Sequence, residues 1–192
     1  MILGLCGLLQ SEKDICANIL VNEHNYTKIR FEDAQKNILY LLFNFQKELL
    51  ENDSWLNKTN DFWSNEVNKN ILNKDIKLWI ENECFQSFFG ENFWVSILKQ
   101  NLLKNKDKNY VIVDVKFQNQ ALVIKNLNGK LIEIRKGSDP LWFRMYKDLG
   151  IQPVDIDISE YSWSNVQMDF VIANDRSYVH LKNLVKDLLA SI

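Results

Sequence analysis

Short apolar runs alternate with amphipathic stretches along this chain. Apolar residues dominate the segments 3–6 and 110–115, and these segments and residues 26–31 each have the length of a strand. Two further strands are predicted over residues 130–135 and 169–174. Because strands that alternate with helices pair in parallel and carry the helices on both faces, the pattern predicts an α/β fold. We expect three layers around a mostly parallel, five-stranded sheet.

Helices are predicted between these strands wherever apolar residues recur at helical spacing. The stretch that begins at Lys13 favours a short helix, and residues 32–50 favour a long one. Residues 52–60 are polar and predict a loop. Further helices are predicted at two or three places within 62–103, and over 118–127 and 177–189.

The chain of 192 residues can bury one sizeable core and is too short for two full domains. We therefore expect a single domain over residues 1–192. Residues 51–105 would form a helical insertion beside the sheet, and residues 136–153, a polar segment with bulky aromatic side chains, a lid-like segment.

Charge and composition disfavour several classes of protein. Lys and Arg number 23 against 25 Asp and Glu, so no global basic field favours a nucleic-acid partner. The three cysteines, an odd number without CxxC spacing, favour a reduced, cytoplasmic protein without disulfides or a zinc site. The apolar residues 1–9 are far fewer than the roughly 20 of a membrane span, so no membrane partner is expected.

The turn after the first predicted strand has the spacing of a phosphate-binding loop. Gly7 and Lys13 are separated as in that motif, in which backbone N–H groups hold phosphate and the lysine reaches the transferred group. Glu12 stands where the motif has glycine, and neither Asp14 nor Ile15 supplies the hydroxyl that meets magnesium. An ordinary strand–turn–helix stays open as the alternative.

Carboxylate and guanidinium groups follow two of the later strands. Asp114 ends an apolar run, and an acid at that end of a parallel strand lies at the ligand-binding edge, where it can hold a metal-bound water. Many apolar runs end in Asp, so a structural role is the alternative. Arg135 and Arg144 lie where mobile cations could close over a transferred phosphoryl group, or on a solvated loop that its aromatic residues anchor.

Seven short motifs also follow one another in a recognisable order. They are residues 4–7 with 11–14, 31–34, 85–90 with 93–95, 113–120, 129–135, 158–160 and 169–175. Together they resemble the bacteriophage-type deoxynucleoside monophosphate kinases, a branch of the P-loop kinase superfamily. The resemblance implies a P-loop NTPase-like fold in which the helical insertion is the cap that binds the nucleoside monophosphate.

The same resemblance implies transfer of the γ-phosphoryl group of ATP to a deoxynucleoside monophosphate (dNMP), with Mg²⁺. The residues that would bind the cofactor are Gly7, Gln10, Ser11, Glu12, Lys13 and Asp14. The catalytic residues would be Lys13, Asp114, Arg135 and Arg144, with Asp114 also at the metal. The substrate would meet Phe31, Asp33, Gln86, Gly90 and Lys116.

The departures from this family cluster at the chemistry. Glu12 replaces Gly, Ile15 replaces Thr, and Lys116 replaces an Arg whose planar fork a lysine does not reproduce. A catalytically degenerate kinase fold, kept as a nucleotide-binding, regulatory or assembly module, is therefore the alternative. A third reading is a protein that binds a partner through the aromatic residues of 142–163. A homodimer is left open.

Overall fold

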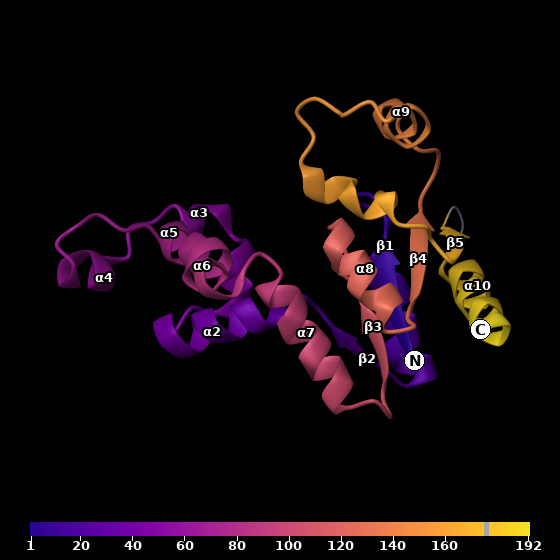
Figure 1. The fold of residues 1–192 in the computed structure, drawn as a ribbon, viewed down its shortest axis with the longest axis horizontal. Coiled ribbons are helices and arrows are strands. Elements are labelled where there is room, and N and C mark those ends of the chain that lie inside the picture. Colours follow the sequence, from indigo (N-terminus) through magenta and orange to yellow (C-terminus); the bar gives the residue numbers. More distant parts are fainter. Residues whose placement is uncertain (175–176) are drawn as a thin grey trace. The chain divides into compact units, whose positions relative to one another are not determined.

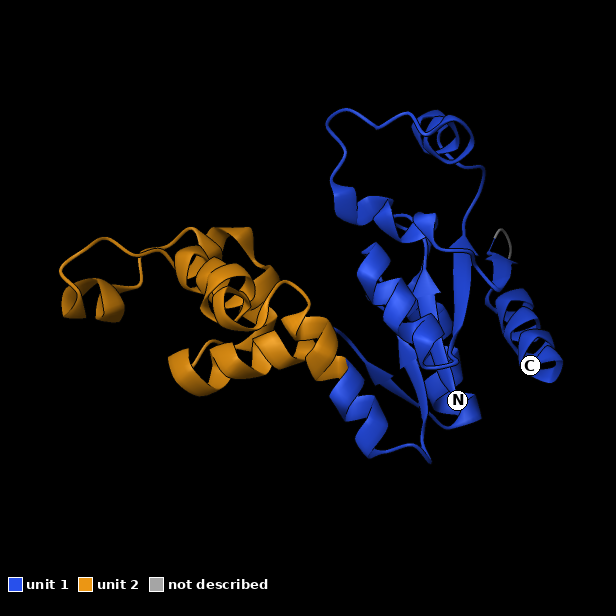
Figure 2. Ribbon diagram, in the orientation of Figure 1, with its two compact units in different colours: residues 1–31, 99–192 blue, residues 32–98 orange. Residues whose placement is uncertain are grey.

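The computed structural model describes residues 1–174 and 177–192, so Asp175 of the last motif lies outside the described residues. The chain divides into two compact units, Met1–Phe31 with Lys99–Ile192, and Glu32–Leu98 (Figure 2). The second unit is helical and begins directly after the second strand, earlier than the expected insertion at residues 51–105.

Five parallel strands form the centre of the first unit (Figure 1). They are β1 (Ile2–Cys6), β2 (Tyr26–Ile29), β3 (Asn109–Ile112), β4 (Lys130–Arg135) and β5 (Phe170–Ala173). The order across the sheet is β2-β3-β1-β4-β5, and every pairing between these strands is parallel. The predicted α/β fold with five strands is confirmed, and the sheet is parallel throughout.

Helices cover both faces of this sheet. Helices α1 (Lys13–His24) and α10 (Tyr178–Ser191) pack on one face against Leu3 and Leu5 of β1. Helix α8 (Gln118–Asn126) lies on the other face, where a Cβ added to Gly4 would stand 2.6 Å from the Ile124 side chain. Because side chains alternate across a strand, one short strand serves both layers. The predicted three layers are confirmed.

The lid-like segment is not a solvated loop. It contains helix α9 (Leu141–Leu149), and the short turns η3 (Ile158–Glu160) and η4 (Ser162–Asn165) follow beyond its end at residue 153. The aromatic side chains of this region largely build a core: Phe143, Tyr146, Tyr161 and Trp163 are all buried. Val154 and Ile158 of the same stretch are exposed, so the reading in which it binds a partner protein stays a prediction.

The second unit is a set of short helices around its own apolar core. Its elements are α2 (Asp33–Phe43), η1 (Lys47–Glu51), α3 (Asp53–Leu56), α4 (Asp61–Glu66), α5 (Asn73–Leu78), the π-helical η2 (Trp79–Cys84), α6 (Gln86–Phe89) and the first half of α7 (Phe93–Lys104). The long helix expected over 32–50 was wrong, because Asn44 adopts a left-handed φ of 54° and ends α2. The loop expected over 52–60 contains α3.

Among the described residues no helix is both long enough and apolar enough to cross a bilayer.

One carboxylate fastens β4, α8 and β5 together at the start of the strands. Asp169 accepts a hydrogen bond of 2.8 Å from the backbone N–H of Leu131, and the Nζ of Lys125 lies 2.8 Å from each of its two oxygens. Burial raises the pKa of Asp169, but the hydrogen bond from Lys125 and that from Leu131 outweigh burial and hold the pKa below its ordinary value.

We predict that Asp169→Asn lowers the free energy of unfolding at pH 7 by about 2 kcal/mol, the usual scale for hydrogen bonds to a charged group. Because the folded pKa is depressed, this stabilisation is complete above the unfolded pKa of about 3.9 and is lost as pH falls through the folded pKa. Urea unfolding of both proteins as a function of pH measures it. The exposed Asp187→Asn is the control, and a difference that does not shrink in acid would contradict the assignment.

Candidate functional site

The predicted site residues of the first unit gather at the carboxyl edge of the sheet. Gly7 follows β1, Phe31 follows β2, Asp114 follows β3 and Arg135 ends β4. The chain leaves β1 into α1 on one face and leaves the neighbouring β3 towards α8 on the other. Connections that part in this way open a crevice at the strand ends, the usual ligand site of a parallel sheet.

The loop between β1 and α1 depends on glycine at its first position. Gly7 has a φ of +147°, and an added Cβ would stand 2.3 Å from the carbonyl oxygen of Ile134. Further along, the N–H of Ser11 donates to the carbonyl of Leu8 at 3.2 Å, closing a turn in which Gln10 has a φ of 65°. The backbone therefore wraps tightly over the end of β4 before α1 begins.

Glu12 takes the backbone conformation for which the motif uses glycine. Its φ of 64° and ψ of 34° are left-handed, and its carbonyl accepts the N–H of Ile15 at the start of α1. The side chain extends to the ends of β4 and β5, where Lys136 and Asn174 donate to its two oxygens. The hydrogen bond from Lys136 is the main reason that the pKa of Glu12 is lowered.

The ammonium group of Lys13 rests on its own loop. Its Nζ donates to the carbonyl oxygens of Gly7 at 2.7 Å and Leu8 at 3.0 Å and lies 3.3 Å from the Oγ of Ser11. Burial lowers the pKa of Lys13, against the opposing charge of Glu160. The lysine therefore lies against the loop between β1 and α1, where protein oxygens hold it; its contact with phosphate stays a prediction.

A carboxylate that the sequence analysis did not select also lies at this loop. The backbone N–H of Leu9 donates to an oxygen of Glu160 at 3.0 Å. Glu160 belongs to η3, 151 residues further along the chain, so no local spacing could have indicated the contact. Its place in a resembling motif was the only signal in the sequence.

Two of the predicted acidic residues are held by neighbouring strand ends. Asp114 accepts the N–H of Phe31 at 2.9 Å, which ties the end of β3 to the end of β2. Asp14 binds Lys28 at 2.6 Å and Arg30 at 2.9 Å. Burial raises the pKa of Asp14, but the hydrogen bond from Lys28 and the two positive charges lower it further, so the net shift is downward.

A cavity of about 390 Å³ opens beside the loop. Its walls are residues 8–11, 133–136, 138–140, Trp142 and Glu160. This volume lies within the range of small-molecule sites. Gln10, Ser11 and Arg135 of the predicted set line it.

A buried acid, Glu133, holds one cation of the cavity wall and one cation of α9. The guanidinium of Arg135 reaches Glu133 at 3.0 and 3.2 Å, and Lys147 of α9 approaches the other oxygen of Glu133 at 3.5 Å. Glu133 is only 3% exposed. Its signal in the sequence was a lone carboxylate inside an apolar strand, which is costly to bury without partners.

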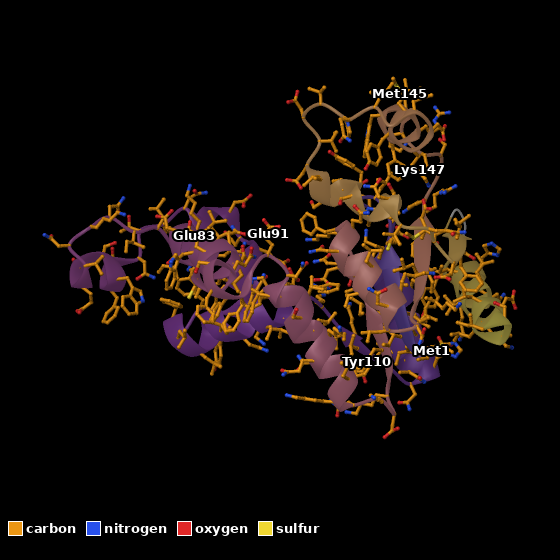
Figure 3. All side chains as sticks on the ribbon, in the orientation of Figure 1. Met1, Glu83, Glu91, Tyr110, Met145 and Lys147 are labelled. Carbon is orange, nitrogen blue, oxygen red and sulfur yellow. The ribbon has the colours of Figure 1, made fainter. Side chains whose placement is uncertain are left out.

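Arg144 does not line this cavity. It lies exposed on α9, and the α9 cation that reaches Glu133 of β4 is Lys147, labelled with its neighbour Met145 in Figure 3. Lys116 lies close enough to Lys13 for its charge to help lower the pKa of Lys13.

The remaining predicted substrate residues belong to the helical unit. Asp33 begins α2, the amide of Gln86 donates to the carbonyl of Glu81 at 2.8 Å, and Gly90 ends α6 with a φ of +86°. Their contact with a substrate stays a prediction.

The carboxylate at the strand ends would suit a Mg²⁺ ion whose other ligands are water molecules and phosphate oxygens. Such a cation needs one or two carboxylates from the protein, and Asp114 supplies one at the end of β3. Among residues 1–174 and 177–192 no group of three or more His, Cys, Asp or Glu side chains could form a cage of protein ligands. Ile15 contributes no hydroxyl.

We compared the chain with known protein families, curated proteins and solved structures. No protein-family model matches the chain, and no curated protein does. Dephospho-CoA kinase from Campylobacter jejuni matches over 99% of this chain and 96% of its own, with 16% identity and a TM-score of 0.51. The chain has the fold of the P-loop kinases. Shikimate kinase from Aquifex aeolicus matches over 100% and 95% of the two chains, with 14% identity and a TM-score of 0.43.

We predict that Glu12→Gly unfolds about 2–4 °C higher than Glu12→Ala. Both variants lose the contacts with Lys136 and Asn174, but only alanine keeps a Cβ in the left-handed conformation of residue 12. Thermal unfolding followed by circular dichroism measures the difference. The same pair of substitutions at exposed Glu23, inside α1, is the control and should reverse the order, because glycine weakens a helix. Equal stability of the two Glu12 variants would refute the left-handed backbone.

Proposed function

We propose that the chain is a phosphotransferase of the deoxynucleoside monophosphate kinase type, which transfers the γ-phosphoryl group of ATP to a dNMP in nucleotide metabolism. The observation that carries the proposal is the loop from Gly7 to Asp14, with Lys13 inside it and Asp114 at the neighbouring strand end. The P-loop kinase fold and the ordered motifs support it. We also propose a cytoplasmic location, which the three unpaired cysteines support.

Phosphoryl transfer depends chiefly on positioning and on stabilising negative charge, so the chain would contribute mainly donors and cations. The backbone of the loop would hold the phosphates, and Lys13 would exchange the carbonyls of Gly7 and Leu8 for phosphate oxygens. Arg135, already in the cavity wall, would add a second cation. Bound Mg²⁺, with Asp114 among its ligands, would neutralise phosphate charge. Asp33, Gln86 and Gly90 would contact the acceptor.

We predict that the chain releases ADP from Mg-ATP in the presence of at least one dNMP, and that Lys13→Ala lowers kcat by a factor of about 100 or more, as for other groups that stabilise a transition state. A coupled ADP-release assay with each of the four common dNMPs measures this. Lys182→Ala, which breaks only the surface pair with Glu23, is the control and should keep the wild-type rate. Turnover no faster than that of Lys13→Ala with every dNMP would reject the enzyme.

A second candidate function is that of a nucleotide-binding, regulatory or assembly module without catalysis. One observation favours it: Lys136, a cation of the cavity wall, is paired with Glu12, the residue that replaces the loop glycine. A carboxylate beside a triphosphate also costs affinity through like-charge repulsion.

Under this second function, calorimetry should show weak or no ATP binding by a normally folded wild-type chain. The double variant Glu12→Gly with Ile15→Thr should then gain measurable affinity, because it frees Lys136 and supplies a hydroxyl near the metal. Ile15→Val is the control, since it alters only packing. ATP affinity in the wild type equal to that of the double variant would exclude these two residues as the cause of lost function.

A further inference from the structure

We propose that the carboxylate of Glu160 is an internal anion that occupies the phosphate loop and has to leave when a polyphosphate binds. The identity of the incoming ligand rests on the function proposed above. The occupation of the loop by Glu160 rests on contacts within the first unit alone.

Glu160 acts on two groups of the loop, the backbone N–H of Leu9 and the ammonium group of Lys13. The N–H of Leu9 donates to its Oε2 at 3.0 Å, and backbone N–H groups of such a loop are the donors that a phosphate uses. The negative charge of Glu160 also acts on Lys13, the loop cation. Glu160 and residues 8–11 line the same cavity. An acidic oxygen thus lies on a backbone donor of the loop, inside the cavity, where a phosphate oxygen would find the same donor.

The backbone that carries Glu160 is fixed by the core. The carboxylate of Asp157 accepts the N–H of Ser159 at 2.8 Å and begins the short turn η3. The carbonyl of Glu160 accepts the indole N–H of Trp163 at 2.8 Å, and Trp163 is 1% exposed. Because its backbone is anchored on a buried tryptophan, the carboxylate is presented to the loop rather than left free in solvent.

The aromatic neighbours connect this turn to the lid-like segment. The rings of Trp163 and Phe143 lie 5.6 Å apart, and those of Tyr161 and Tyr146 lie 4.6 Å apart. Phe143 and Tyr146 belong to α9, which also carries Lys147 towards Glu133. The turn that carries Glu160 and helix α9, which contributes Trp142 to the cavity wall, therefore share one aromatic core.

The competition should weaken anion binding without abolishing it. Glu160 offers one negative charge and one hydrogen bond to Leu9, whereas a triphosphate brings several charges and several acceptors. Loss of the carboxylate charge should therefore tighten binding of a polyphosphate by about three- to tenfold, the net scale of one ordinary, solvent-exposed hydrogen bond.

The test compares Glu160→Gln, which removes the charge, with Glu160→Ala, which removes the acceptor as well. Glu23→Gln is the matched control: it changes the net charge equally, on the exposed surface of α1, where Glu23 pairs with Lys182. Calorimetry at about 0.15 M salt gives the Kd of each chain for inorganic tripolyphosphate and for ATP. Amide hydrogen exchange of Leu9, measured by NMR without ligand, reports the contact itself.

We expect exchange at Leu9 to accelerate in Glu160→Ala, and both Glu160 variants to bind tripolyphosphate more tightly than the wild type, with Glu23→Gln unchanged. Equal affinity in all four chains would overturn the proposal, as would weaker binding by the Glu160 variants, since Glu160 would then assist the ligand. Failure of the proposed function would look different: no dNMP turnover in any chain, with the dependence of tripolyphosphate binding on Glu160 intact. Absence of tripolyphosphate binding by every chain would reject both.

Discussion

The close approach of the first loop to the end of β4 is the constraint on which the site depends. Gly7 lies so near the carbonyl of Ile134 that no side chain fits, and this contact brings the loop against the strand that carries Glu133 and Arg135. Because the strands are parallel, their carboxyl ends share one edge, and residues distant in sequence meet there. The cavity, the loop lysine and the acids around them all follow from this packing.

The cations at this edge are already engaged by protein oxygens. Lys13 rests on loop carbonyls, Arg135 is held by Glu133 and Asp139, and Lys136 binds Glu12. A cation with a nearby carboxylate keeps its orientation at the cost of its attraction for other anions. The cations at this edge are therefore held in fixed positions, and nearby carboxylates neutralise part of their positive charge. Under the proposed function, a polyphosphate would have to replace some of these contacts, and the balance of that exchange would determine whether it binds.

The fold was predictable because its strands are short apolar runs and its first loop begins with a glycine. The ends of the helices were harder to predict from the sequence. Asparagine residues in left-handed conformations end some of them, as at Asn25 and Asn44, and the spacing of apolar residues does not indicate where a helix stops. Helix α9 was hidden in a polar segment, although Phe143 and Tyr146, three residues apart, bury one face of it. Contacts such as Leu9 with Glu160 depend on the finished fold and have no local pattern.

Glu12 shows how a departure from a motif can be read in physical terms. Its backbone keeps the left-handed conformation that the loop requires, so the path of the chain survives the loss of glycine at the cost of some strain. Its side chain finds Lys136 and Asn174, which offsets part of that strain and joins the loop to two strand ends. Glu12, whose carboxylate would repel a phosphate, can therefore help to hold the loop in place. Reduced function at this site is accordingly compatible with a well-formed loop, and activity has to be judged from the charges around the loop rather than from its shape.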